Sequence, residues 1–291
     1  MELHKEKLVR KKTLLEIFSA AMLDNTSRFA PIENCLYIQC ARALKMTIDI
    51  NCDIGEGMLT DEAIMPFISS ANIACGYHAG DVDTIRKTIE LCLKHQVAIG
   101  AHPSFFGKEN FGRTEINLPE QEIYELVTQQ LFLFNEIADS LDAKLHHIKP
   151  HGALYNMSAK NKLIARAVAN AVKDFNKELI LYGLSGSCLV TEAKVIGLKT
   201  AHEVFADRTY QNDGSLTPRT KAGALIEDPG KAVKQILLMV KDKTVRTIDD
   251  KLIPMTANTI CIHGDGKHAV EFAKNIFEAL AGQSINIKSP E

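Results

Sequence analysis

Apolar and polar positions follow a repeating unit along this chain, and the unit first appears at Met46. Each copy has a short apolar run, a polar glycine-rich turn, and a stretch whose apolar residues recur at helical spacing. The apolar runs, which we expect to be strands, are residues 46–52, 70–75, 97–101, 143–149, 178–183, 198–205 and 258–264. Between them, residues 83–95, 119–141 and 228–242 have the spacing of amphipathic helices.

Strands that alternate with helices indicate right-handed crossovers and a parallel sheet. Seven such units within residues 46–291 favour a closed barrel over an open doubly wound sheet. We therefore predict an α/β fold, a TIM-like (β/α) barrel with seven strands. Residues 46–291 form its single catalytic domain in this prediction, and residues 1–45 form an N-terminal extension whose order the sequence does not define.

Polar and ionisable side chains follow six of the seven predicted strands. In such barrels the carboxyl ends of the strands surround one mouth, where the active site lies. Taken singly, an Asp or His after a strand is more often a turn former or a helix cap, and Asp81 stands where a helix begins. Their coincidence at six strand ends favours a shared site. The residues are Asn51, Asp53, Glu56, His78, His102, Lys149, His151, Glu203, Asp207, Arg208, His263 and Asp265.

Composition narrows the class of partner. The chain has a formal net charge of -2 with 24% charged residues and no long basic run, so neither nucleic acid nor an anionic membrane surface is an expected partner. No apolar stretch approaches the roughly 18 residues that span a bilayer. The seven cysteines show no CxxC spacing, which suits a reducing compartment better than a disulfide framework. We expect a cytoplasmic protein.

Seven motifs in order along the chain resemble one family. They are "IDINCDIGEG", "SANIACGYHAGD", "VAIGAHPSF", "FGR", "HIKPHGALYN", "FADRTYQNDGSL" and "ICIHGD". Together they are similar to the LamB/YcsF family of lactam-utilisation proteins, which includes the A subunit of the bacterial ATP-dependent 5-oxoprolinase. The resemblance runs from about Thr47 to Ile287. It implies a barrel related to those of glycoside hydrolases and deacetylases.

The resemblance also implies an activity and partners. The chain is then one component of an enzyme that cleaves 5-oxo-L-proline to L-glutamate while hydrolysing ATP to ADP and phosphate. ATP with Mg is the implied cofactor and subunits B and C are the implied partners, and a homo-oligomer is compatible with this assembly. The chain contains no GxxxxGK[ST] phosphate loop, since "HGDGKH" at residues 263–268 lacks the first glycine and ends in His.

Opening a lactam through phosphorylation calls for cations near phosphoryl oxygens, a base for water and an acid for the ring nitrogen. Lys149, Arg208 and Arg113 are the candidate cations. For the base we consider Asp53 or His151, and for proton delivery His78 or His102. The expected catalytic residues are thus Asp53, His78, His102, Lys149 and His151, and the expected substrate-binding residues are Asn51, Glu56, Arg113, Glu203, Asp207, Arg208, His263 and Asp265.

A bound metal is left open by the residues. Asp53, His78, His102, His151 and His263 include the imidazole and carboxylate ligands of zinc, manganese or iron, with Asp53, His78 and His151 as first candidates. The lack of an HExxH pair favours a metal-free pocket. Two other functions remain alternatives: a stand-alone metal-dependent deacetylase or amidohydrolase, and a non-catalytic carrier or scaffold subunit of a larger complex.

Overall fold

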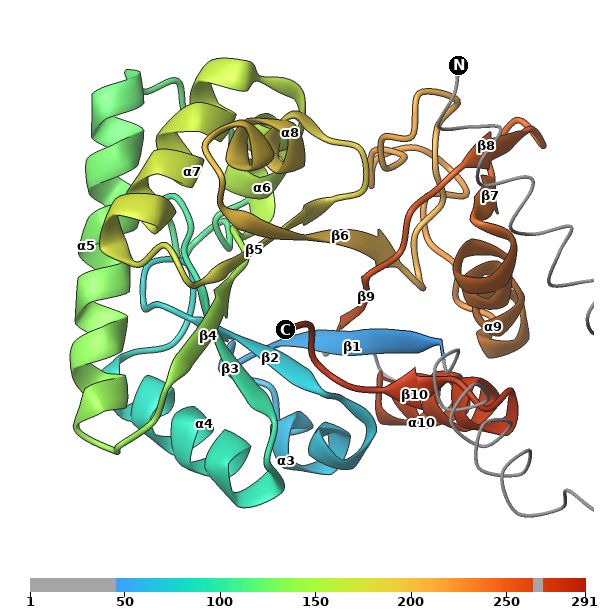
Figure 1. The fold of residues 1–291 in the computed structure, drawn as a ribbon, viewed down its shortest axis with the longest axis horizontal. Coiled ribbons are helices and arrows are strands. Elements are labelled where there is room, and N and C mark those ends of the chain that lie inside the picture. The colour runs from blue at the N-terminus through green and yellow to red at the C-terminus, as the bar shows by residue number, and fades with distance from the viewer. Residues whose placement is uncertain (1–45, 264–268) are drawn as a thin grey trace, which may run out of the picture. The chain divides into compact units, whose positions relative to one another are not determined.

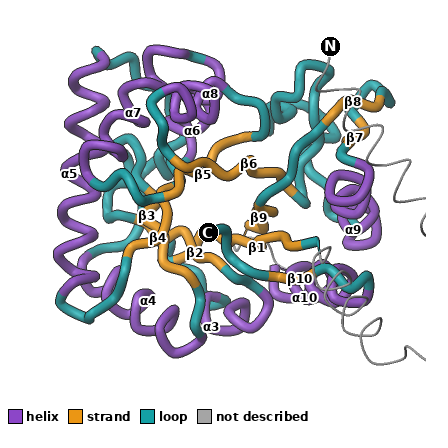
Figure 2. The backbone as a smooth tube through the Cα atoms, viewed as in Figure 1, coloured by secondary structure: helices purple, strands orange, loops and turns teal. Residues whose placement is uncertain are grey.

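The structure is a computed structural model that describes residues 46–263 and 269–291. Residues 46–291 form one compact unit, in which a ring of strands is surrounded by helices (Figures 1 and 2). The expected extension over residues 1–45 and the candidate residue Asp265 lie outside the described residues.

Seven parallel strands close into the barrel. They are β1 (Thr47–Ile54), β2 (Ser70–Ala74), β3 (Ala98–His102), β4 (Leu145–Ile148), β5 (Ile180–Leu184), β6 (Lys199–Phe205) and β9 (Thr259–His263). The ring closes because β9 pairs with both β6 and β1, so that Cys261 lies opposite Phe205 on one side and Asn51 on the other. Each predicted apolar run overlaps one of these strands, and the predicted seven-stranded barrel is confirmed.

Helices cover the outside of the ring (Figure 2). They are α3 (Asp61–Ile64), α4 (Val82–His95), α5 (Glu120–Asp139), α6 (Gly152–Lys160), α7 (Lys162–Phe175), α8 (Cys188–Val195), α9 (Pro229–Leu237) and α10 (Ala269–Gly282). A 3₁₀ turn at Met65–Phe67 follows α3, and a π-helical turn at Leu238–Asp242 occupies the end of the third predicted helix. Within the described ranges no helix has both the length and the apolar character needed to cross a membrane.

Three short strands were not predicted. β7 (Thr244–Arg246) and β8 (Leu252–Pro254) form an antiparallel hairpin, and β10 (Asn286–Ile287) adds to the first residues of β1. Two or three residues are too few to show an alternating pattern. After β10, the Pro290 carbonyl oxygen lies 2.9 Å from Nε2 of His146 near the start of β4. The C-terminal segment therefore runs across the end of the barrel where the strands begin (Figure 1).

Polar side chains fill the inside of this barrel, where branched apolar residues usually pack. Side chains on β1 alternate in direction, so Asp49, Asn51 and Asp53 share the inner face. Asp49 receives a hydrogen bond from Tyr182 on β5, which is not a neighbouring strand, so the two side chains meet inside the ring. Thr259 donates to Asp49 and accepts from Asn51, each at 2.6 Å. The interior is therefore hydrogen-bonded from the floor at Asp49 towards the mouth at Asp53.

Candidate active site

A buried lysine lies among acidic groups at the mouth. Lys149 directly follows β4, and its Nζ is 2.7 Å from Oδ1 of Asp53, 2.9 Å from Oε1 of Glu203 and 3.1 Å from Sγ of Cys261. Burial by itself would lower the pKa of Lys149, but the carboxylates of Asp53 and Glu203 outweigh it, and the pKa lies well above its usual range. We call these four residues the lysine cluster, and its carboxylates favour the charged ammonium form of Lys149.

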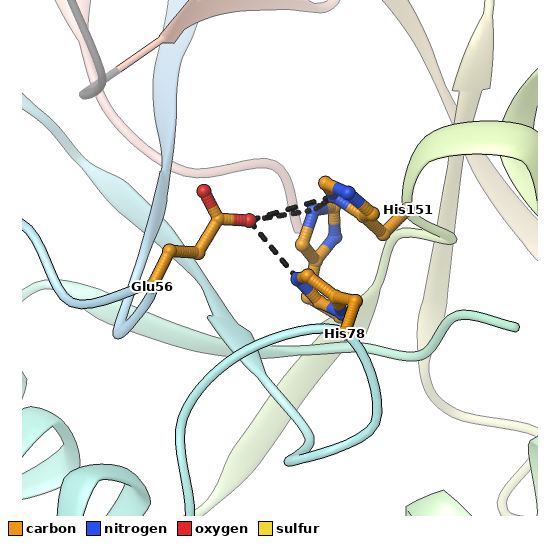
Figure 3. Close-up of side chains that lie close together, drawn as sticks. Glu56, His78 and His151 are labelled. Atoms are coloured by element: carbon orange, nitrogen blue, oxygen red, sulfur yellow. Dashed lines mark hydrogen bonds and ion pairs between the residues drawn. The ribbon is translucent and has the colours of Figure 1, made fainter. Parts of the chain in front are cut away.

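Beside it, one carboxylate and three imidazoles converge (Figure 3). We call Glu56, His78, His102 and His151 the histidine cluster. Oε1 of Glu56 is 3.0 Å from Nε2 of His78, 3.4 Å from Nδ1 of His151 and 3.9 Å from Nε2 of His102. Nδ1 of His151 is 2.8 Å from Nε2 of His102. One ligand atom from each of the four residues lies within 4.8 Å of the others, an arrangement that could hold a metal ion.

Each residue of this cluster comes from a different strand end. Glu56 lies in the turn after β1, His78 in the turn after β2, and His102 is the last residue of β3. His151 comes after β4 and immediately precedes α6. Burial lowers the pKa of His78 to about 3 and the pKa of His151 well below its usual range, so both rings are neutral near pH 7.

The loop that contains "FGR" holds two of the imidazoles in place. Phe111 has a left-handed backbone (φ 59°), and its carbonyl oxygen lies 3.0 Å from Nε2 of His151. At Gly112 (φ 62°), a Cβ atom would lie 2.9 Å from Cβ of His78. At Gly152 (φ 54°), a Cβ atom would lie 2.6 Å from the Gly112 carbonyl oxygen. Only glycine gives both this backbone and this close approach, so the loop packs directly on the cluster.

The two clusters form one site. Nε2 of His102 lies 3.3 Å from Oδ2 of Asp53, whose other oxygen is bound by Lys149. Asn72 on β2 donates to the same Oδ1 atom of Asp53 at 2.8 Å. A lysine ammonium group, a carboxylate and imidazoles therefore stand side by side, and together they can stabilise negative charge and transfer protons.

Comparison with known proteins gives the family of this chain. The family model for LamB/YcsF proteins matches residues 48–291. The chain belongs to the LamB/YcsF family. The 5-oxoprolinase A subunit of Bordetella pertussis is 49% identical over 247 residues, which cover 83% of this chain and 98% of that protein. The protein of the same name from Brevibacillus brevis is 48% identical over 246 residues, 83% of this chain and 97% of that protein. The resemblance seen in the sequence motifs is confirmed.

A solved structure extends the likeness to three dimensions. The lactam utilization protein from Thermus thermophilus superposes with a TM-score of 0.80 at 37% sequence identity. The matched region covers 84% of this chain and 100% of that chain. This chain and the solved relative therefore share the same barrel fold.

Three further candidate residues of this LamB/YcsF chain lie in or near the barrel interior. Asn51 is inside the barrel, and its Oδ1 accepts from Asn72 at 2.7 Å and from Lys149 at 3.3 Å. The guanidinium of Arg113 lies over the ring of Phe111, 4.9 Å from its centroid. Arg208 is buried and donates to the Thr217 carbonyl oxygen at 2.6 Å.

Asp207 and Arg208 follow β6, and the Arg208 guanidinium donates its hydrogen bond to the Thr217 backbone. His263 is the last residue of β9, and the described residues do not include its side chain. The structure thus gathers Asn51, Asp53, Glu56, His78, His102, Lys149, His151 and Glu203 at the mouth, and Arg113 stands next to it. The roles expected for all candidate residues stay predictions.

Four further residues contact the site without having been predicted: Asn72, Ser104, Phe111 and Cys261. Asn72 had a readable signal, because an amide in the middle of the run "SANIAC" is out of place on an apolar strand. Phe111 had none, since it contributes a backbone carbonyl group. Ser104 and Cys261 are small residues common in cores and loops, so residue type alone does not single them out.

Proposed function

We propose that this chain is the A subunit of a 5-oxoprolinase and opens the ring of 5-oxo-L-proline to give L-glutamate. In this proposal it works with partner subunits B and C in the cytoplasm, and the reaction is coupled to hydrolysis of ATP to ADP and phosphate. The observation that carries the proposal is the match to relatives of that name along nearly their whole length. The charged mouth supports it, because lactam opening needs groups of these kinds.

A five-membered lactam is a resonance-stabilised amide, so its carbonyl carbon resists attack by water. Transfer of a phosphoryl group from ATP to the carbonyl oxygen creates a better leaving group. Water then adds to the carbon, and the C–N bond breaks as the ring nitrogen takes up a proton. Cleavage of the C–N bond leaves the side-chain carboxyl group of glutamate as an acyl phosphate. A second water hydrolyses this acyl phosphate to the carboxylate and phosphate, so the whole reaction consumes two waters.

The lysine cluster suits the charge that develops during this reaction. Lys149 remains an ammonium ion at the mouth, where it can neutralise a carbonyl or phosphoryl oxygen. Asp53 is the better placed base, because its Oδ1 is held by Lys149 and Asn72 while Oδ2 faces His102. The neutral rings of His78 and His151 lie within reach as proton acceptors or donors.

ATP binding is assigned to the assembled complex in this proposal. The chain has no GxxxxGK[ST] loop, and the candidate cation Lys149 lies at the mouth of the barrel. A partner subunit that brings ATP and Mg to this mouth would complete the reacting groups.

The direct test is glutamate release by the complex reconstituted with and without this chain, in the presence and absence of ATP. Asp53→Ala, Lys149→Ala and His151→Ala should each lower kcat by about 1,000-fold or more while circular dichroism stays unchanged. Asp213→Ala, Lys94→Ala and His202→Asn replace the same residue types away from the mouth and should retain parental activity. Near-normal turnover in all three mouth variants would contradict the proposed site.

The histidine cluster favours one second candidate, a stand-alone metal-dependent amidohydrolase. That function predicts cleavage of an amide substrate by this chain alone, without ATP and without partners. The carrier alternative predicts the reverse pattern: the mouth variants keep activity as long as the complex assembles. Assaying the isolated chain and the complex side by side separates the three functions.

A further inference from the structure

We propose that Glu56, His78, His102 and His151 form a binding site for one divalent transition-metal ion. The inference goes beyond the proposed function, because metal binding at these residues would hold whatever substrate the barrel takes. It rests on the hydrogen bonds around the three imidazoles, which decide which nitrogen of each ring carries a hydrogen.

The outer nitrogen of every ring faces an acceptor. Nδ1 of His102 lies 2.7 Å from the Lys149 carbonyl oxygen, and Nε2 of His151 lies 3.0 Å from the Phe111 carbonyl oxygen. A carbonyl oxygen only accepts, so both nitrogens carry a hydrogen. Nδ1 of His78 lies 2.9 Å from Oγ of Ser104, whose own hydrogen goes to the Phe105 carbonyl oxygen at 2.9 Å. Ser104 therefore accepts from His78 as well.

A metal ion binds the singly protonated form of imidazole, and in that form these outer N–H groups leave the inner nitrogens with lone pairs that face one another. Nε2 of His102 and Nδ1 of His151 are only 2.8 Å apart, and Oε1 of Glu56 lies 3.0 Å from Nε2 of His78. Four electron-rich atoms at such distances repel unless a cation lies among them. Ligand atoms around a tetrahedral zinc ion are about 3.3 Å apart, given bond lengths near 2 Å. The observed separations of 2.8, 3.0, 3.4 and 3.9 Å bracket that value.

The surroundings of the cluster have the character of a metal site. Metal-bound histidines usually donate their second nitrogen to a carbonyl or hydroxyl oxygen, which fixes the tautomer and the ring plane. All three rings do so here, and the Phe111 carbonyl oxygen comes from a backbone in the left-handed region. His78 and His151 stack with their ring centroids 3.8 Å apart, which holds both inner nitrogens towards Glu56.

The donor set selects the class of metal. Three imidazole nitrogens and one carboxylate oxygen suit zinc, iron(II), cobalt(II), nickel(II) or manganese(II), whereas magnesium and calcium prefer oxygen ligands throughout. A divalent ion at this position would supply Lewis acidity next to Asp53 and Lys149.

Metal content of the untagged full-length chain tests the proposal. The protein is stripped with chelator, equilibrated with each of these five ions, freed of excess ion and analysed by mass spectrometry for metal per chain. We expect close to one ion per chain for at least one metal, with a rise in thermal midpoint over the stripped protein. Cobalt(II) bound at the cluster in a low-symmetry geometry should also give absorption bands in the visible range.

Variants assign the metal to the cluster. His78→Ala and His151→Ala should reduce affinity at least about 100-fold, and Ser104→Ala about 10- to 100-fold because it only orients His78. His202→Asn on β6 is the matched control and should bind like the parent. Where an alanine variant does not fold, Glu56→Gln removes a ligand with little change in shape.

Absence of stoichiometric metal under all five conditions would overturn the proposal and leave a shared proton between His102 and His151. Equal binding by His151→Ala and His202→Asn would overturn it too, since the metal would then lie elsewhere on the chain. Glutamate release plays no part in either readout, so the metal site and the proposed function can fail independently.

Discussion

Two sets of buried polar side chains lie inside the same barrel, one at its floor and one at its mouth. They differ in how far hydrogen bonds satisfy their polar atoms. At the floor, Oδ1 of Asp49 accepts from the hydroxyls of Ser69 and Ser70, and Oδ2 accepts from Tyr182 and Thr259. At the mouth, Glu56 meets three imidazoles whose hydrogens point outward to other acceptors. The floor is a saturated network, and the mouth is a convergence of acceptors.

This difference distinguishes buried polar residues that stabilise the fold from buried polar residues that form a functional site. Both regions are withdrawn from water, so burial alone does not mark a site. A saturated carboxylate has no capacity left for a ligand, and its hydroxyl partners are satisfied in return. Lone pairs that face one another without a hydrogen or a cation between them lower the stability of the folded protein. Such sites persist where a ligand or a reaction uses them.

The largest expected effect on stability comes from breaking the floor. Asp49→Ala leaves four hydroxyl groups without their acceptor, and we expect it to lower the free energy of unfolding by about 4 kcal/mol. Urea denaturation followed by circular dichroism measures the loss. Asp49→Asn keeps the shape of the side chain but replaces one acceptor oxygen with an NH₂ donor, so it should lower the free energy of unfolding less than Asp49→Ala. Parental stability in Asp49→Ala would remove the contrast between floor and mouth.

A truncation at the mouth should cost much less. In chelator-treated protein, His151→Ala removes a lone pair that opposes His102, which offsets the lost packing and the lost bond to the Phe111 carbonyl oxygen. We expect a change of about 1 kcal/mol or less in the free energy of unfolding. The same denaturation experiment measures it. A cost equal to that of Asp49→Ala would show that the mouth is as much a structural network as the floor.

The smallest effect is expected at an exposed carboxylate whose hydrogen bonds come from its own helix. Asp81 caps α4, and its Oδ1 accepts from the backbone N–H and the hydroxyl of Thr84, which lower its pKa. A group whose folded pKa lies below its unfolded value stabilises the protein above the unfolded pKa and loses this effect as the pH falls through the folded pKa.

Thermal midpoints of the parent, Asp81→Ala and Asp81→Asn measure this small contribution. Asp81→Ala should melt slightly below the parent at pH 7, and the gap should close as the pH falls below about 4. Asp81→Asn, which still caps, should stay near the parent at pH 7. A gap that does not depend on pH would assign the effect to something other than the charge of Asp81.

The sequence predicted the barrel well because an apolar run of ordinary length overlaps each of its strands, and most of these runs stand beside glycines. It did not predict β7, β8 and β10, which hold two or three residues each and depend on tertiary pairing. At the mouth, residue types at strand ends were readable. The division into a lysine cluster and a histidine cluster was not, because it depends on which side chains meet across the ring and on carbonyl groups such as that of Phe111.

The ladder between β1 and β9 has a consequence for how this protein folds during its synthesis on the ribosome. It joins Asp49 to Thr259, whose side chains are 210 positions apart in the chain. Contacts of such high order form late, because a long loop must close before they contribute anything. Until β9 has been synthesised, β1 and β6 each present an open edge to which other chains can pair. Yield during expression should therefore depend on how quickly the C-terminal part of the polypeptide follows the rest, and cooler or chaperone-rich conditions should help most during that interval.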